Sequence, residues 1–146
     1  MQGFYEIEHK ADIGLEIFGE TLEQLFIQAV YGFYSILLPD VNLQKLNSHG
    51  KAYHLKVNED SADNALISLL NELNFLFSAK KIILLPVKSI SIYKNDFFTI
   101  SLKSGVISKI PDAWLENATE IKAVTYHDLQ IKRENGLFKV RVIFDI

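Results

Sequence analysis

The chain has 146 residues, of which 49% are hydrophobic and 23% charged; these values predict a single folded domain over residues 1–146 and exclude a disordered or low-complexity segment. It contains no cysteine, which excludes disulfide scaffolds, thiolate zinc sites and cysteine nucleophiles. The net charge is −3 and no basic run is longer than a pair such as Lys80-Lys81, so we expect no strong direct binding to nucleic acid.

The first third of the chain passes from a strand pattern to a helix pattern. Apolar and polar residues alternate over 5–9 and 13–17, which predicts two strands. Apolar residues at helical spacing then predict a helix over 21–38. Thr21 and Gln24 form the pattern of a capping box at its start, and Pro39 stops it.

A second helical stripe predicts a helix over 61–79, capped by Asp60 or Ser61. Asn135-Gly136 predicts a tight hairpin turn. Two-residue alternation predicts further strands over residues 53–57, 90–92, 98–102, 121–126, 129–133 and 137–144. Together these elements predict an α+β fold of two layers, with two helices packed on a largely antiparallel β-sheet.

Common catalytic and targeting signatures are absent from the sequence. It has no Gly-rich phosphate loop, no G-x-S-x-G elbow and no H-E-x-x-H helix, and its four histidines are not spaced like a metal pair. No apolar segment reaches the ~20 residues of a membrane helix, and no signal peptide opens the chain. We therefore expect a cytoplasmic protein with no membrane association.

Carboxylates near two strand ends are the candidate chemical groups. Asp12 stands between the first two predicted strands, where an aspartate is most often a turn residue. The last predicted strand runs directly into Asp145 and Ile146, and the alternation turns Asp145 away from the core. These groups would offer the hard oxygen ligands that Ca²⁺ and Mg²⁺ prefer, provided that the fold brings them together.

Five ordered segments resemble the archease family, and the resemblance spans the whole chain. The first segment, from His9 to Ile13, resembles the family's H-T-A-D-I/V motif, and the last, Asp145-Ile146, resembles its terminal D-I. Between them lie G-E-T-L-E-Q-L-F at 19–26, L-N-E-L followed by F-L-F within 70–77, and E-I-K-A-V-T-Y-H at 120–127.

The resemblance implies an accessory, chaperone-like protein that is not itself an enzyme. Archeases activate the RtcB-type RNA ligase of tRNA splicing and RNA repair, promoting its guanylylation and multiple turnover. The resemblance also implies a divalent cation, Ca²⁺ first with Mg²⁺ or Mn²⁺ as alternatives, bound by Asp12, Asp145 and Ile146. It assigns the activation of the ligase partner to Lys122 and His127.

Three positions depart from the family pattern. Lys10 replaces the threonine beside Asp12, which places a positive charge near the expected cation. Ser68 stands where the family often has an aspartate, and Leu115 where many members have a histidine.

Two other functions compete with the activator. One is a metal-dependent phosphohydrolase that uses the same carboxylates to activate water. The other is a structural adaptor in which Asp12 only shapes a turn. A hydrolysis assay without ligase tests the first, and calorimetry with Ca²⁺ and Mg²⁺ tests the second.

Overall fold

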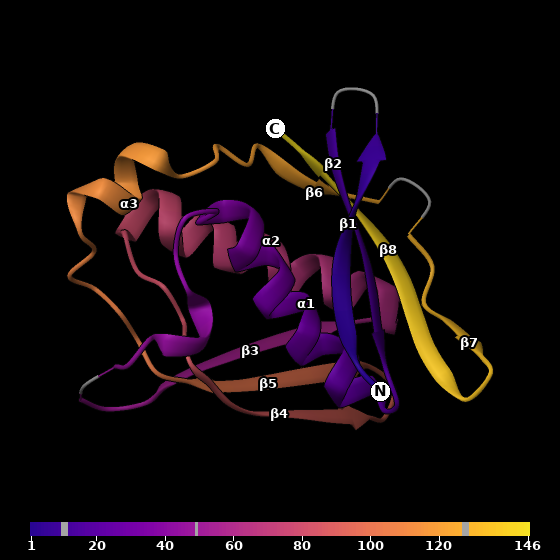
Figure 1. The fold of residues 1–146 in the computed structure, drawn as a ribbon. Coiled ribbons are helices and arrows are strands. Elements are labelled where there is room, and N and C mark those ends of the chain that lie inside the picture. Colours follow the sequence, from indigo (N-terminus) through magenta and orange to yellow (C-terminus); the bar gives the residue numbers. More distant parts are fainter. Residues whose placement is uncertain (10–11, 49, 127–128) are drawn as a thin grey trace.

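The computed structural model describes residues 1–9, 12–48, 50–126 and 129–146 (Figure 1). In these ranges antiparallel strands and helices make an α+β fold, as the sequence predicts. The strands are β1 (Gly3–His9), β2 (Asp12–Gly19), β3 (Tyr53–Glu59), β4 (Val87–Lys94), β5 (Phe98–Ser104), β6 (Ala123–Thr125), β7 (Lys132–Glu134) and β8 (Leu137–Asp145). The helices are α1 (Leu22–Leu37), α2 (Ala62–Lys80), the short α3 (Asp112–Asn117) and the 3-10 turn η1 (Leu43–Lys45).

Helix α1 begins at the expected capping box. The Thr21 hydroxyl accepts a hydrogen bond from the Gln24 backbone N–H at 3.1 Å. The Gln24 side chain in turn accepts from the backbone N–H of Glu20 at 2.9 Å. The cap thus satisfies the Gln24 N–H, one of the donors that a helix start leaves unpaired, and the second bond fixes the residue before the cap. Helix α1 ends at Leu37, shortly before Pro39.

Helix α2 is capped by Ser61, which decides between the two candidates. The Ser61 hydroxyl accepts from the Asn64 backbone N–H at 3.1 Å, while Asp60 accepts from the Asn64 side chain at 2.6 Å. The helix ends at Lys80, and the next residue, Lys81, adopts the left-handed conformation with φ of 54°.

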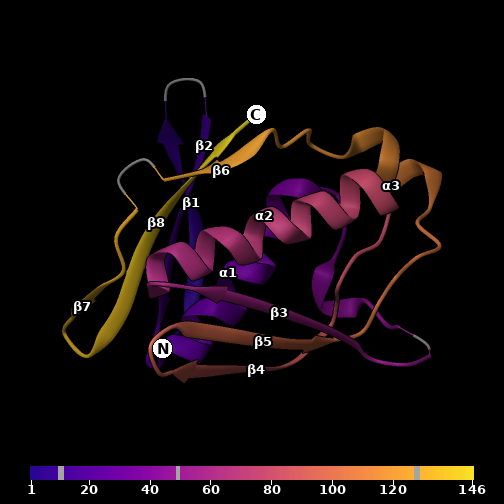
Figure 2. The same ribbon diagram turned by 180° about the vertical axis from the view of Figure 1, so that it is seen from behind.

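The strands divide into two sheets, a division that the sequence pattern did not reveal. One sheet has the order β1-β2-β8-β6, with β7 also paired to β8, and the other has the order β3-β5-β4. Helix α1 packs on β1, β2 and β4, and α2 packs on β3, β5 and β6. Both helices therefore lie in the angle between the two sheets (Figures 1 and 2).

Several boundaries differ from the prediction. The strand expected over 121–126 is only Ala123–Thr125, and the one expected over 129–133 is Lys132–Glu134. The Asn135-Gly136 turn has φ of 51° and 77°, so the predicted hairpin between β7 and β8 is confirmed. None of the described helices is both long and apolar enough to cross a membrane.

Tyr34 of α1 connects the helix to the segment before β4 from inside the core. Its side chain is fully buried, and its hydroxyl accepts a hydrogen bond from the Leu84 backbone N–H at 2.9 Å. Burial raises the pKa of Tyr34, so the hydroxyl stays protonated at ordinary pH.

We expect Tyr34→Phe to lower the free energy of unfolding by about 1–2 kcal/mol, because it leaves a buried N–H without its acceptor. Urea unfolding measures this change. Tyr93→Phe is the matched control, since Tyr93 is 59% exposed, and it should leave stability unchanged. Equal stability of both variants would contradict a structural role for the Tyr34 hydroxyl.

Candidate functional site

Strand β8 lies in the interior of its sheet, with β2 on one side and β6 and β7 on the other. Its residues alternate between the two faces of the sheet. Phe144 turns inward, where its ring centroid lies 6.3 Å from that of Phe33 in α1. Asp145 therefore lies on the outer face, as the alternation predicts.

Asp12 and Asp145 stand directly opposite each other across β2 and β8. Opposite residues of antiparallel strands share a face, with Cβ atoms about 4.5–5.5 Å apart. Both aspartates are half-buried, and Ile146, the next residue, is 38% exposed. The fold thus brings together the three residues that the sequence analysis could only place at separate strand ends.

The backbone of Lys122 contacts Asp145. Its N–H donates a hydrogen bond to the Asp145 carbonyl oxygen at 2.8 Å, and its neighbour Ala123 pairs with Asp145 in the register. Ile121 is 6% exposed, whereas the Lys122 side chain faces solvent, which confirms the predicted exposure of Lys122. His127 and Lys10 lie outside the described residues.

Asn71 of α2 holds β6 in place, a role that the sequence analysis missed. Its side-chain amide accepts from the Val124 N–H at 3.0 Å and donates to the Val124 carbonyl oxygen at 3.4 Å. Asn74, one helical turn later, donates to the Ile121 carbonyl oxygen at 2.8 Å. The signal in the sequence was two asparagines three residues apart, and so on one face, of the expected helix.

Two of the positions that depart from the family pattern have defined contacts. The Ser68 hydroxyl donates to the Glu59 carboxylate at 2.6 Å, which connects α2 to the end of β3. Leu115, in α3, is partly buried against the core. Both side chains therefore contribute to the packing of the fold.

The donor set around Asp12 and Asp145 is small. In the part of the chain that the structure describes, no three Asp, Glu or His side chains gather closely enough to hold a metal ion. A cation here would be held by two carboxylates, by the carboxylate of Ile146 and by water. Oxygen-only ligands of this kind suit Ca²⁺, Mg²⁺ or Mn²⁺ better than softer metals.

A family model and two curated relatives all connect this chain with archeases. The archease protein family (MTH1598/TM1083) matches residues 4–146. A protein archease from Thermoplasma volcanium is 31% identical over 97% of this chain and 98% of its own length. An archease-like protein from Dictyostelium discoideum is 27% identical over all of this chain and 95% of its own length.

Two solved structures share the fold. The solution structure of Methanobacterium thermoautotrophicum protein 1598 is 26% identical, with a TM-score of 0.79 over 99% of both chains. An archease from Thermotoga maritima, described as a possible chaperone, is 21% identical, with a TM-score of 0.60 over 96% of this chain and 94% of that one. None of these four names refers to an enzymatic activity. With the family match over nearly its whole length, the chain belongs to the archease family.

Proposed function

We propose that this protein binds a divalent cation at Asp12, Asp145 and Ile146, and that it acts as an accessory factor for an RtcB-type RNA ligase. In this role it promotes guanylylation and multiple turnover of the ligase and performs no catalysis of its own. The observation that carries the proposal is the register of β2 and β8, which sets Asp12 opposite Asp145 beside the last residue.

Electrostatics supports a cation at this place. Two like charges directly opposite on neighbouring strands repel each other, and a third negative group beside them adds to the cost. A bound cation supplies the positive charge that offsets this repulsion. The chain itself fixes Asp145 in the sheet, through its pairing with β2 and through the hydrogen bond from the Lys122 N–H.

The direct test is single-turnover guanylylation of an RtcB-type ligase with GTP, with and without this protein. The wild type should accelerate formation of the ligase–GMP adduct, and Asp145→Asn should accelerate it much less. Asp40→Asn is the matched control, because Asp40 is exposed in the turn after α1. Equal rates with and without the wild-type protein would contradict the proposed role.

Lys122 should matter for activation and little for stability. Because its side chain faces solvent while its backbone makes the contact with Asp145, Lys122→Ala should change the free energy of unfolding by less than about 0.5 kcal/mol. Activation of the ligase should nevertheless fall. Lys80→Ala, another exposed lysine, is the control in both assays, and unchanged activation by Lys122→Ala would show that Lys122 is only a surface residue.

The protein should bind free RNA weakly at physiological salt. With a net charge of −3 it neutralises few phosphates, so its binding releases few counterions from the RNA. We expect a dissociation constant above about 10⁻⁴ M, the weak end of non-specific binding. Fluorescence anisotropy with a labelled oligonucleotide measures it. Tight binding under these conditions would point to a protein that acts on RNA directly.

A further inference from the structure

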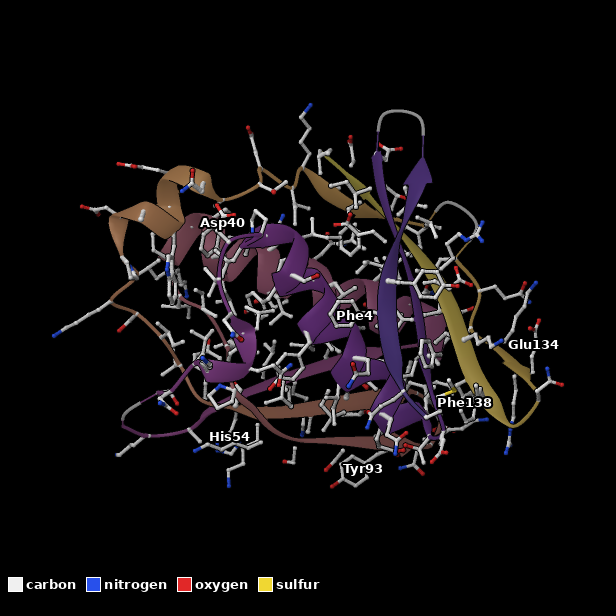
Figure 3. All side chains as sticks on the ribbon, in the orientation of Figure 1. Phe4, Asp40, His54, Tyr93, Glu134 and Phe138 are labelled. Atoms are coloured by element: carbon white, nitrogen blue, oxygen red, sulfur yellow. The ribbon has the colours of Figure 1, made fainter. Side chains whose placement is uncertain are left out.

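The outer face of the β3-β5-β4 sheet is a second polar surface. The inner face packs Ile100 and Leu102 of β5 into the core. The alternate residues of the three strands face outward, and Figure 3 shows His54 and Tyr93 pointing away from the helices. The C-terminus and this sheet lie on opposite sides of the helices in Figures 1 and 2, so this surface is separate from the Asp12–Asp145 pair.

The strand register places cations and hydroxyls next to each other on this face. Each row runs across β3, β5 and β4 in turn. The two rows are His54–Lys103–Ser89 and Lys56–Ser101–Ser91. They line a shallow hollow with a volume of about 320 Å³.

No carboxylate belongs to either row, and in the described part of the chain neither Lys56 nor Lys103 forms an ion pair. The Glu59 carboxylate accepts a hydrogen bond from Ser68 of α2. Asp60 and Asp96 follow β3 and β4 at the other end of the sheet. In a chain of net charge −3, this end of the sheet is therefore a local cationic surface with hydrogen-bond donors.

An exposed aromatic ring lies one row beyond the cations. The next row is Asn58–Thr99–Tyr93, and Tyr93 is 59% exposed. Lysine and hydroxyl donors hold phosphates, and an exposed ring on a sheet stacks on unpaired bases. Because an acidic protein segment would use the cations without needing the ring, the combination favours nucleic acid.

We propose that this sheet face binds single-stranded RNA, with phosphates on the two cationic rows and a base on Tyr93. The inference goes beyond the proposed ligase activation and does not depend on it. The two lysines neutralise two phosphates, so the logarithm of the affinity for a single strand falls with the logarithm of the salt concentration with a slope of about 1.4. Binding is therefore weak at physiological salt, and it strengthens roughly 25-fold when the salt concentration falls tenfold.

The test is anisotropy of a labelled ten-nucleotide oligouridylate at about 20 mM salt, where counterion release is favourable. We expect Lys56→Glu/Lys103→Glu to weaken binding at least tenfold. The matched control, Lys80→Glu/Lys109→Glu, changes the net charge equally at exposed lysines elsewhere and should keep most of the affinity. We expect Tyr93→Ala to weaken binding about tenfold through lost stacking, with the salt slope unchanged.

Amide shifts of the wild-type protein titrated with the same oligonucleotide locate the contact without any substitution. They should concentrate on β3, β4 and β5. No binding at low salt, equal loss in the control variant, or shifts confined to other strands would overturn the proposal. Competition by a decaglutamate peptide as strong as that by unlabelled oligonucleotide would also overturn it, and would assign the face to an acidic protein.

Discussion

Without divalent cations, Asp145→Asn should unfold at a higher temperature than the wild type, and in excess Ca²⁺ the order should reverse. The substitution keeps the shape of Asp145 and removes one of two like charges that face each other across β2 and β8. We expect it to stabilise the cation-free protein by about 0.5 kcal/mol. At a cation concentration of 100 Kd the wild type gains about 2.7 kcal/mol, whereas a variant with weakened affinity gains much less.

Thermal unfolding with and without EDTA, paired with calorimetry, measures both halves of this prediction. Asp40→Asn should behave as the wild type in both conditions. A C-terminal tag should weaken cation binding, because it converts the Ile146 carboxylate into an amide. An N-terminal tag should not, since it interrupts only the exposed ion pair of the Met1 amine with Glu20. Equal Ca²⁺ affinity in all of these proteins would contradict the proposed cation site and leave Asp12 as a turn residue.

The second large effect concerns stability. We expect Asn71→Ala to lower the free energy of unfolding by about 2–4 kcal/mol, because it leaves the N–H and the carbonyl of buried Val124 without their partner. In a domain of this size that corresponds to a fall in Tm of roughly 5–15 °C. Differential scanning calorimetry measures it.

Glu72→Ala, on the same helix turn and half-exposed, is the matched control and should change the free energy of unfolding by less than about 0.5 kcal/mol. Asn71→Asp tests the two hydrogen bonds with Val124 separately. It keeps an acceptor for the Val124 N–H but sets a carboxylate against the Val124 carbonyl oxygen, so it should also destabilise the protein. Full stability of the Asp variant would show that the 3.4 Å contact with the carbonyl contributes little.

The helices, their caps and the hairpin turn can be predicted from the sequence, because each is determined by residues close together in the chain. The helical stripes, the Thr21 and Ser61 caps and the Asn135-Gly136 turn each depend on residues within a few positions of one another. The exposure of Lys122 and the outward direction of Asp145 likewise follow from simple alternation.

The pairing of strands cannot be predicted in this way. A two-residue period shows which face of a strand is buried, but it does not show which strand lies beside it. The alternation of β2 fits many partners, and only the folded chain shows that Asp12 pairs with Asp145. The division into two sheets was missed for the same reason. The strand expected over 121–126 was overpredicted because only Ala123–Thr125 pair with β8, and alternation does not show where the pairing with a partner strand stops.

The interior position of β8 has a consequence for how the chain folds. Strands β2 and β8 lie far apart in the chain: Glu16 and Arg141, which are joined by a 3.1 Å ion pair, are 125 positions apart. At 5–20 residues per second, a ribosome makes β2 roughly 6–25 s before β8 is complete. During that interval the β1–β2 hairpin has an open strand edge, so the nascent chain must avoid edge-to-edge association until its last strand arrives.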